Sequence, residues 1–107
     1  MKLVVISAVN RGKEYVVQEG NNLIGRWDPD DKSFPEIDLE QEDVDAKISR
    51  RHCVIVKTGE QVSIEDIGSL NGTFVNETHK LTAGERHVLK AGDQILVGKT
   101  LLRLDNS

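Results

Sequence analysis

The chain is patterned by short runs of apolar residues, many of them β-branched, which are separated by turn-forming residues. Apolar residues alternate with other positions in these runs, as at Val54 and Val56 and then at Val62 and Ile64, which is typical of strands with one buried face. Helix-period patterns are nearly absent. Strands are predicted at Lys2–Ser7, Glu14–Gln18, Asn22–Arg26, Ile37–Leu39, His52–Lys57, Gln61–Asp66, Thr73–Val75, Arg86–Leu89, Gln94–Val97 and Thr100–Leu104. This pattern predicts an all-β fold, a two-sheet antiparallel β-sandwich of about ten to eleven short strands.

Hairpin-like turns divide the predicted strands, and glycine supplies the positive φ that such turns need. They fall at Asn10–Lys13, Thr58–Glu60, Ala91–Asp93 and Gly98–Lys99. No repeat, linker or low-complexity tract separates two halves of the chain. We therefore expect residues 1–107 to form a single domain, which is long enough to bury a core without cross-links.

The composition indicates which residues form the core and which cellular compartment fits the domain. Hydrophobic residues make up 37% of the chain but aromatic residues only 4%, so the core must consist mainly of Val, Ile and Leu. Cys53 is the one cysteine, so no internal disulfide can form, and a reducing compartment such as the cytoplasm fits best. The apolar run at the N-terminus stops at Ser7, which is too short for a signal peptide or a membrane span.

The charge of the chain is acidic overall and unevenly distributed. A net charge of −4 argues against broad nucleic-acid binding, which needs a basic face. Acidic residues crowd the irregular stretch from Trp27 to Asp45, and they predict either a solvated loop or a surface that repels anionic ligands or forms a second contact. Basic residues then reappear at Lys47, Arg50 and Arg51. This local basic spot suggests that one anion binds at one place.

Three short segments begin or end predicted strands, so their loops can lie together at one end of the sandwich. They are Gly25-Arg26, Ser49-Arg50-Arg51-His52 and the run from Gly68 to Thr73. The segments offer guanidinium, hydroxyl and amide donors without a paired base or metal cluster. Donors without a catalytic partner predict a receptor for an anion, and phosphate is the best match.

The order and spacing of these segments resemble the forkhead-associated (FHA) domain family, whose members are phosphothreonine-binding β-sandwiches. Gly-Arg, Ser-Arg-x-His and Ser-x-Asn-Gly-Thr carry the resemblance, which runs from about Leu3 to Leu104. The resemblance implies that Arg26 and Ser49 contact the phosphate and that Arg50 adds a further phosphate or peptide contact. It also implies that Asn71 hydrogen-bonds the peptide backbone.

Five further residues are expected to support the recognition loops rather than to touch the ligand. Gly25 allows a tight backbone, and the resemblance implies that His52 holds the loops through hydrogen bonds. Ser69, Gly72 and Thr73 are expected to stabilise the turn around Asn-Gly.

Two positions bear on specificity and affinity. Lys47 lies two residues before Ser49, where family members select the residue three after the phosphothreonine, and a lysine favours Asp or Glu there. Leu70 stands where the family often has Ser or Thr, so this chain lacks one hydroxyl donor.

Other classes of function have less support in the sequence. A hydrolase built on Ser49 or Cys53 with His52 lacks a nucleophile, base and orienting group in one set, so no enzyme is expected. His79 and His87 lie in separate segments with no Cys or Asp at a ligand spacing, so neither a metal nor a cofactor is expected. The partner is predicted to be a phosphothreonine-containing protein or peptide, bound by a monomer, with no nucleic acid or membrane involved. A phosphate-independent interaction module on the same scaffold stays open as the alternative.

Overall fold

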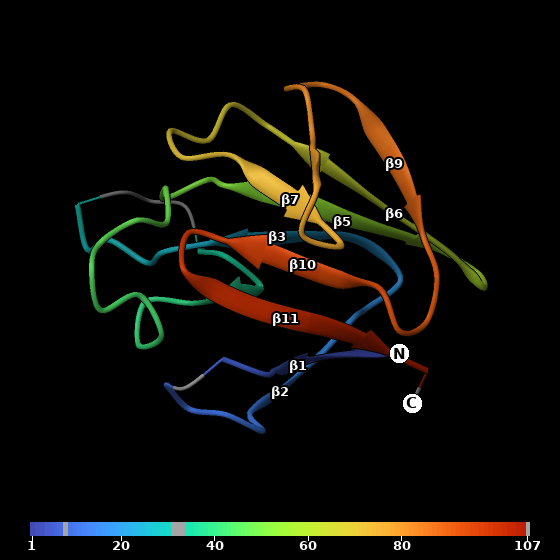
Figure 1. The fold of residues 1–107 in the computed structure, drawn as a ribbon, viewed down its shortest axis with the longest axis horizontal. Coiled ribbons are helices and arrows are strands. Elements are labelled where there is room, and N and C mark those ends of the chain that lie inside the picture. Colours follow the sequence, from blue (N-terminus) through green and yellow to red (C-terminus); the bar gives the residue numbers. More distant parts are fainter. Residues whose placement is uncertain (8, 31–33, 107) are drawn as a thin grey trace.

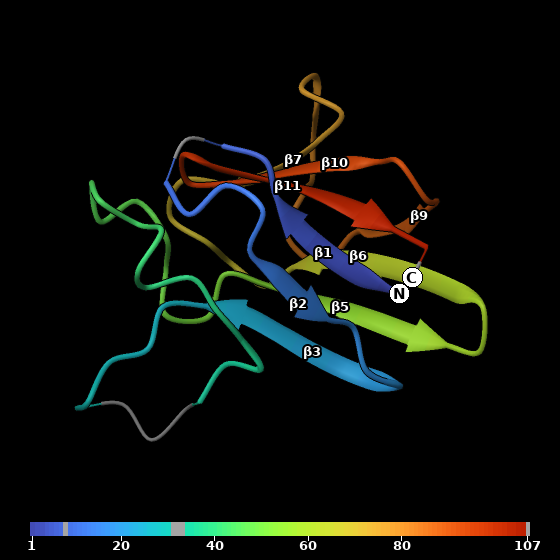
Figure 2. The same ribbon diagram turned by 90° about the horizontal axis from the view of Figure 1, so that it is seen from below.

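The computed structural model describes residues 1–7, 9–30 and 34–106, which form eleven strands and no helix. The strands are β1 Lys2–Val5, β2 Glu14–Val16, β3 Gly20–Gly25, β4 Ile37–Asp38, β5 Cys53–Thr58, β6 Gln61–Asp66, β7 Thr73–Val75, β8 His79–Lys80, β9 Arg86–Leu89, β10 Gln94–Val97 and β11 Thr100–Asp105. They form a six-stranded sheet, in the order β2-β1-β11-β10-β7-β8, and a five-stranded sheet, in the order β4-β3-β5-β6-β9 (Figures 1 and 2). The predicted two-sheet, all-β architecture is confirmed.

The ten predicted strands are all present, and their ends differ from the predicted ones by about two residues at most, as is usual for strand ends. The short strand β4 pairs with β3 in parallel, whereas the other pairs are antiparallel. Strand β8 was not predicted, because its two residues are exposed and carry no apolar alternation. It forms because Asn76 and Glu77, with φ of 50° and 70°, turn the chain back onto β7.

The core lies between the two sheets and follows the alternation in the sequence. In β11 the positions Thr100, Leu102 and Leu104 are buried, and the positions between them are partly exposed. Strand β5 buries Cys53 and Ile55 in the same way. The buried cluster is aliphatic, as the composition predicted, and complete burial of each Val, Leu or Ile side chain contributes about 1.5–3 kcal/mol.

Two carboxylates of the acidic stretch lie inside the fold. The side chain of Glu42 is 0% exposed, and its Oε1 accepts a hydrogen bond from the Tyr15 hydroxyl at 2.8 Å and lies 3.4 Å from Lys13 Nζ. Burial together with this carboxylate raises the pKa of Tyr15 far above its ordinary value. The prediction of a solvated acidic loop is therefore wrong for Glu42 and also for Asp43, whose side chain is 2% exposed.

The chain ends lie side by side, since Lys2 of β1 pairs with Asp105 of β11. Both ends lie away from the loops that join β3 to β5 (Figure 1). In the described part of the chain, no helix has the length and apolar character needed to cross a membrane.

Candidate functional site

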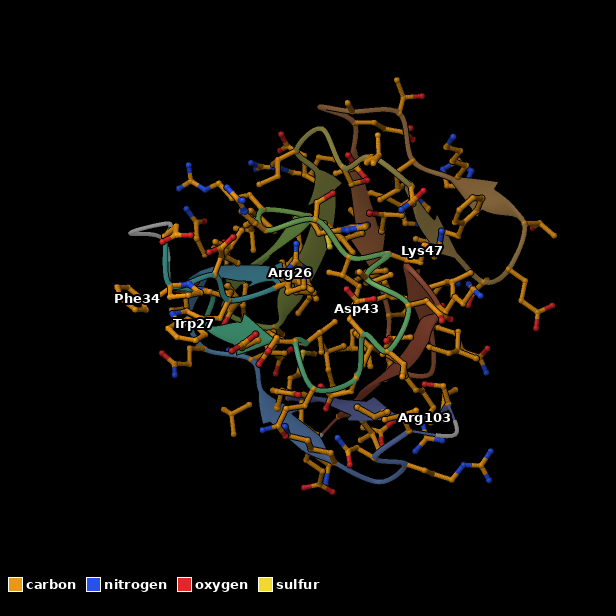
Figure 3. All side chains as sticks on the ribbon, turned by 90° about the vertical axis from the view of Figure 1, so that its left-hand side faces the viewer. Arg26, Trp27, Phe34, Asp43, Lys47 and Arg103 are labelled. Atoms are coloured by element: carbon orange, nitrogen blue, oxygen red, sulfur yellow. The ribbon has the colours of Figure 1, made fainter. Side chains whose placement is uncertain are left out.

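The three donor segments identified in the sequence meet at one end of the sandwich. The end of β3, the connection from β4 to β5 and the loop from β6 to β7 together border a shallow depression (Figure 3). Its lining includes Arg26, Lys47, Ser49, Arg50, Leu70 and Asn71. We call this depression and the loops around it the recognition end.

Gly25 permits a close approach between β3 and the β4–β5 connection. A Cβ atom at this position would lie 1.9 Å from the carbonyl oxygen of Arg50, which is far inside van der Waals contact. The next residue continues the contact, because the backbone N–H of Arg26 donates to the carbonyl of Ser49 at 3.2 Å. A side chain at position 25 would therefore push the two segments apart.

The guanidinium of Arg26 is held by one of its three nitrogens. Its Nε donates to the carbonyl of Ile48 at 3.2 Å and lies 3.8 Å from Asp43 Oδ2. Within the described residues, the two terminal Nη groups make no hydrogen bond. Arg26 thus keeps a pair of parallel donors for an oxyanion while its stem is fixed.

Asp43 organises the loop that carries Ser49, and the sequence analysis missed this role. Its Oδ1 accepts the backbone N–H of Lys47 at 2.7 Å, and its Oδ2 accepts that of Ile48 at 3.0 Å. The same buried carboxylate faces Arg26 (Figure 3). An aspartate four residues before a turn is a common local acceptor for the backbone, but nothing in the sequence distinguished Asp43 from its acidic neighbours.

Ser49 has its hydroxyl oxygen fixed while its proton stays available. The oxygen accepts the backbone N–H of Leu70 at 3.0 Å. No acceptor for the Ser49 O–H is found among residues 1–7, 9–30 and 34–106. Because a hydroxyl both donates and accepts, this proton remains free for a ligand oxygen at the recognition end.

His52 connects the two loops from a fully buried position. Its Nδ1 accepts the backbone N–H of Ser49 at 3.1 Å, so the proton of the neutral ring lies on Nε2, which donates to the carbonyl of Gly72 at 2.8 Å. Burial lowers the pKa of His52, although nearby groups partly oppose this effect. The neutral imidazole is thus the form that fits its two partners.

Asp66 anchors the β6–β7 loop through four hydrogen bonds, and it too was missed. Its Oδ1 accepts the backbone N–H groups of Gly68 at 2.8 Å and Ser69 at 2.9 Å. Its Oδ2 accepts the hydroxyls of Ser69 and Thr73. Burial alone would raise the pKa of Asp66, but these hydrogen bonds outweigh burial and lower it. The sequence signal was present, since an aspartate at a strand end, two residues before Gly-Ser, favours such a turn.

The rest of the β6–β7 loop is fixed around Asn71. The backbone N–H of Gly72, whose φ is 88°, donates to Ser69 Oγ at 3.0 Å. The Asn71 amide nitrogen donates to the carbonyl of Lys47 at 2.9 Å, which ties this loop to the β4–β5 connection. In the described part of the molecule no donor reaches Asn71 Oδ1, so the amide oxygen is available to a peptide N–H.

Three other positions that the sequence singled out, Arg50, Lys47 and Leu70, have side chains that the protein holds less tightly. Arg50 lines the depression, yet its Nε pairs with Asp28 Oδ2 at 2.8 Å. Lys47 is exposed, and its ammonium forms no ion pair with any residue that the structure describes. Leu70 is 88% exposed, so an apolar side chain projects into solvent beside Asn71.

The structure provides no reactive thiol. Cys53 is fully buried, and this burial raises the pKa of its thiol to about 12. At neutral pH the thiolate, which is the nucleophilic form, is therefore almost absent. His52 already has a partner on each ring nitrogen, so it is poorly placed to act as a base.

A β-sandwich with oriented anion donors on loops at one end has the arrangement of a recognition domain. A model of the FHA domain family matches residues 22–98, which include all three donor segments. The chain belongs to the FHA domain family.

Individual relatives agree in sequence and in structure. The chain is 35% identical over 97 residues to the oxoglutarate dehydrogenase inhibitor of Corynebacterium jeikeium, a match that covers 91% of this chain and 58% of the inhibitor. Its structure is similar to the FHA domain of the CT664 protein from Chlamydia trachomatis, with a TM-score of 0.76, 31% identity and coverage of 99% and 97% of the two chains. It is also similar to Mycobacterium tuberculosis EmbR in complex with a low-affinity phosphopeptide, with a TM-score of 0.75, 29% identity and coverage of 99% of this chain and 24% of EmbR. The chain thus spans less than two thirds of the length of the curated relatives that it matches first.

Proposed function

We propose that this protein binds phosphothreonine-containing segments of partner proteins at the recognition end. One observation carries the proposal: Arg26, Ser49 and Asn71 each have one polar atom fixed by the protein and another left available at the same depression. The similarity to EmbR, which was solved with a phosphopeptide, supports the same ligand class.

The phosphate chemistry fits these donors. A phosphothreonine carries about −1.5 to −2 charges and three acceptor oxygens at neutral pH. The terminal groups of Arg26 can donate to two oxygens, and the Ser49 hydroxyl can donate to a third. Arg50 would reach the same group by exchanging Asp28 for the phosphate. Since the loops are already cross-linked by hydrogen bonds, little ordering cost accompanies binding.

The peptide itself would be held beside the phosphate. The Asn71 side chain presents an oxygen to a backbone N–H of the ligand, while its nitrogen stays bound to the carbonyl of Lys47. The ammonium of Lys47 favours Asp or Glu three residues after the phosphothreonine, by a contact worth about 1 kcal/mol or less because it is exposed. Peptides that differ only by Asp, Leu or Lys at that position test this preference.

The wider role follows from the same assignment. We propose a regulator or adaptor without catalytic activity, in which residues 1–107 act as one binding domain and as a monomer in the cytoplasm. Gly25, His52, Ser69, Gly72 and Thr73 serve as loop supports. The name of the corynebacterial relative, an inhibitor, is in keeping with a regulatory role.

The decisive experiment is calorimetric titration with a degenerate phosphothreonine peptide pool beside the same pool without phosphate. Binding to the phosphorylated pool alone is expected. Equal binding to both pools would favour the phosphate-independent interaction module. If neither pool binds, and pools of wider sequence also fail to bind, the proposal is contradicted.

A matched pair of arginine variants locates the site. Arg26→Ala should cost about 2 kcal/mol or more of binding free energy, roughly thirtyfold or more in affinity, because it removes a charged partner of the phosphate. Arg51→Ala removes the same kind of side chain two positions beyond Ser49 but outside the depression. Its affinity should stay within about twofold of the native value. Binding that survives Arg26→Ala within twofold would refute the site assignment.

A further inference from the structure

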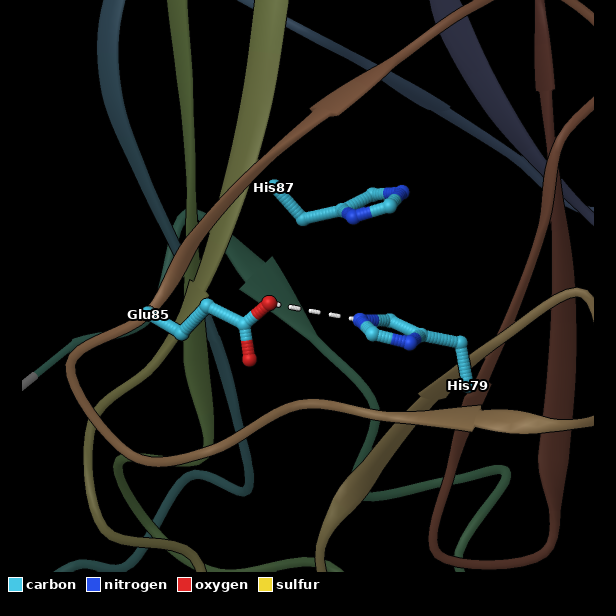
Figure 4. Close-up of side chains that lie close together, drawn as sticks. All are labelled: His79, Glu85 and His87. Atoms are coloured by element: carbon cyan, nitrogen blue, oxygen red, sulfur yellow. Dashed lines mark hydrogen bonds and ion pairs between the residues drawn. The ribbon is translucent and has the colours of Figure 1, made fainter.

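Three potential metal ligands meet where the edges of the two sheets approach each other. His79 belongs to β8, the edge strand of the six-stranded sheet, and His87 belongs to β9, the edge strand of the five-stranded sheet. Glu85 directly precedes β9, and its side chain lies beside both rings (Figure 4). The sequence analysis set these histidines apart because they lie in different segments. The β8–β9 crossover brings them together.

The spacing of the ligand atoms suits one small cation. Glu85 Oε2 lies 3.3 Å from His79 Nε2, and one ligand atom from each of the three residues lies within 4.8 Å of the others. A tetrahedral zinc site with bonds of about 2.0–2.1 Å places neighbouring ligand atoms roughly 3.3 Å apart. One edge of that tetrahedron is thus already formed. The side chains of His79 and Glu85 are 48% and 39% exposed, so small rotations can close the remaining distances.

The glutamate is held in position by its own turn. Its Oε1 accepts the backbone N–H of Thr82 at 3.0 Å, and its backbone N–H donates to the carbonyl of Thr82 at 2.8 Å. This leaves Oε2 directed toward His79 (Figure 4). A hydrogen bond to the second oxygen of a ligating carboxylate is the usual outer support of a metal site.

The two imidazole rings also lie close together, with the carboxylate of Glu85 beside them. Their centroids are 5.0 Å apart with the planes tilted by 33°. Two imidazoles and one carboxylate favour zinc and its first-row neighbours over calcium or magnesium, which prefer oxygen ligands alone.

We propose that His79, Glu85 and His87 form a binding site for a divalent first-row transition metal ion, with Zn²⁺ the best match. The three side chains supply three ligands, and water takes the fourth position. Because the ligands come from both sheets, the ion joins two sheet edges between which the described residues form no backbone pairing. The three proposed metal ligands are not among the residues proposed to contact the phosphopeptide.

The site lies close to the recognition end. The β8–β9 connection borders a hollow that it shares with Ser69, Leu70 and Gly72 of the β6–β7 loop. The backbone N–H of Gly84 donates to the carbonyl of Asp66 at 2.9 Å, which links this connection to the anchor of that loop. A bound ion would therefore restrain one flank of the recognition loops.

Direct titration tests the site. Zn²⁺ is added to tag-free protein at neutral pH in competition with a zinc-binding indicator, and one ion per chain is expected. His79→Ala, His87→Ala and Glu85→Gln should each weaken binding at least tenfold, since even outer-shell changes cost roughly 10–100-fold in metal affinity. Glu60→Gln, which removes an exposed carboxylate from the β5–β6 turn, should bind like the native protein. Absence of binding, or equal losses in Glu60→Gln and His87→Ala, would overturn the proposal.

Nuclear magnetic resonance of the native protein gives a second test that needs no variant. Zn²⁺ should shift the ring signals of His79 and His87 and leave those of His52 unchanged, because His52 is fully buried and already bonded on both ring nitrogens. Unshifted signals of His79 and His87 at saturating Zn²⁺ would refute the assignment.

Discussion

Replacing Asp66 with asparagine measures how far a single carboxylate organises the recognition end. The change keeps the size and shape of the side chain and removes its charge. Asp66 accepts four hydrogen bonds from a position that is 3% exposed, and all four donors belong to the β6–β7 loop or to the first residue of β7. The perturbation is therefore confined to the loop that carries Asn71.

The expected magnitude follows from the donors. The N–H groups of Gly68 and Ser69 cannot reverse, so the amide oxygen of the introduced asparagine must face them and its NH₂ group must face the two hydroxyls, which can rotate to accept. Each of the four bonds then changes from a charged to a neutral partner, a difference of about 1 kcal/mol per bond. We expect Asp66→Asn to lower the free energy of unfolding by about 2–4 kcal/mol, allowing for partial relaxation.

Urea denaturation at pH 7 measures this loss. Glu60→Gln removes the same charge from an exposed turn and should change the stability by less than about 0.5 kcal/mol. Phosphopeptide affinity should fall in Asp66→Asn as well, because Asn71 and the Leu70 N–H lose their fixed positions. A stability loss below about 1 kcal/mol, or one equal to that of Glu60→Gln, would refute the role assigned to this carboxylate.

The pH dependence gives an internal check on the same reasoning. The pKa of Asp66 is lowered in the folded protein from its ordinary value of 3.8. Its contribution to stability is therefore complete above that value and is lost as the pH falls through the lowered pKa. The stability difference between the native protein and Asp66→Asn should shrink as the pH falls below about 4. A constant difference down to pH 2 would contradict the assignment.

Three further predictions address the supporting residues. Gly25→Ala should destabilise the fold by about 1–3 kcal/mol, because the added methyl group clashes with the Arg50 carbonyl. The same change should weaken phosphopeptide binding at least tenfold, and unchanged affinity in a titration would show that the loop adapts. The stability of the native protein should fall as the pH drops from 6.5 toward the lowered pKa of His52, because His52 takes up a proton at a higher pH in the unfolded chain than in the folded protein. A melting temperature that stays constant between pH 7 and pH 5 would contradict this. Leu70→Thr should raise phosphopeptide affinity severalfold by adding a hydroxyl donor, with stability unchanged since the side chain is 88% exposed; equal affinity in calorimetry would mean that this hydroxyl does not reach the ligand.

The strands and the three donor segments could be predicted because both depend on local sequence. Buried positions such as Leu102 and Leu104 alternate with partly exposed ones, and this alternation is independent of what lies across the core. The donors of Gly25-Arg26, Ser49 and Asn71 come at strand ends, where a sandwich gathers its loops. Local pattern was thus sufficient to predict the fold and the meeting of the three donor segments at one end of the sandwich.

Other features of the fold and the site could not be predicted from local pattern. Asp43 lies among acidic residues of the same type, and what distinguishes it is that its carboxylate accepts the backbone N–H groups of Lys47 and Ile48. Strand β8 depends on pairing with β7 rather than on its own residues. His79 and His87 meet only because β8 and β9 are edge strands of different sheets. Each of these features depends on tertiary placement, which a pattern along the chain does not contain.

Because Lys2 pairs with Asp105, the two ends of the sandwich chain lie side by side. The geometry of the recognition end therefore does not depend on the order in which the strands follow one another along the chain. A short linker could join the two ends, and new ends could be opened at the turn between β5 and β6, which lies at the same side of the molecule as the termini (Figure 1). Surface turns of this kind commonly tolerate circular permutation. Such a rearranged chain would keep every loop of the recognition end intact, since the receptor depends on where the strands lie in space.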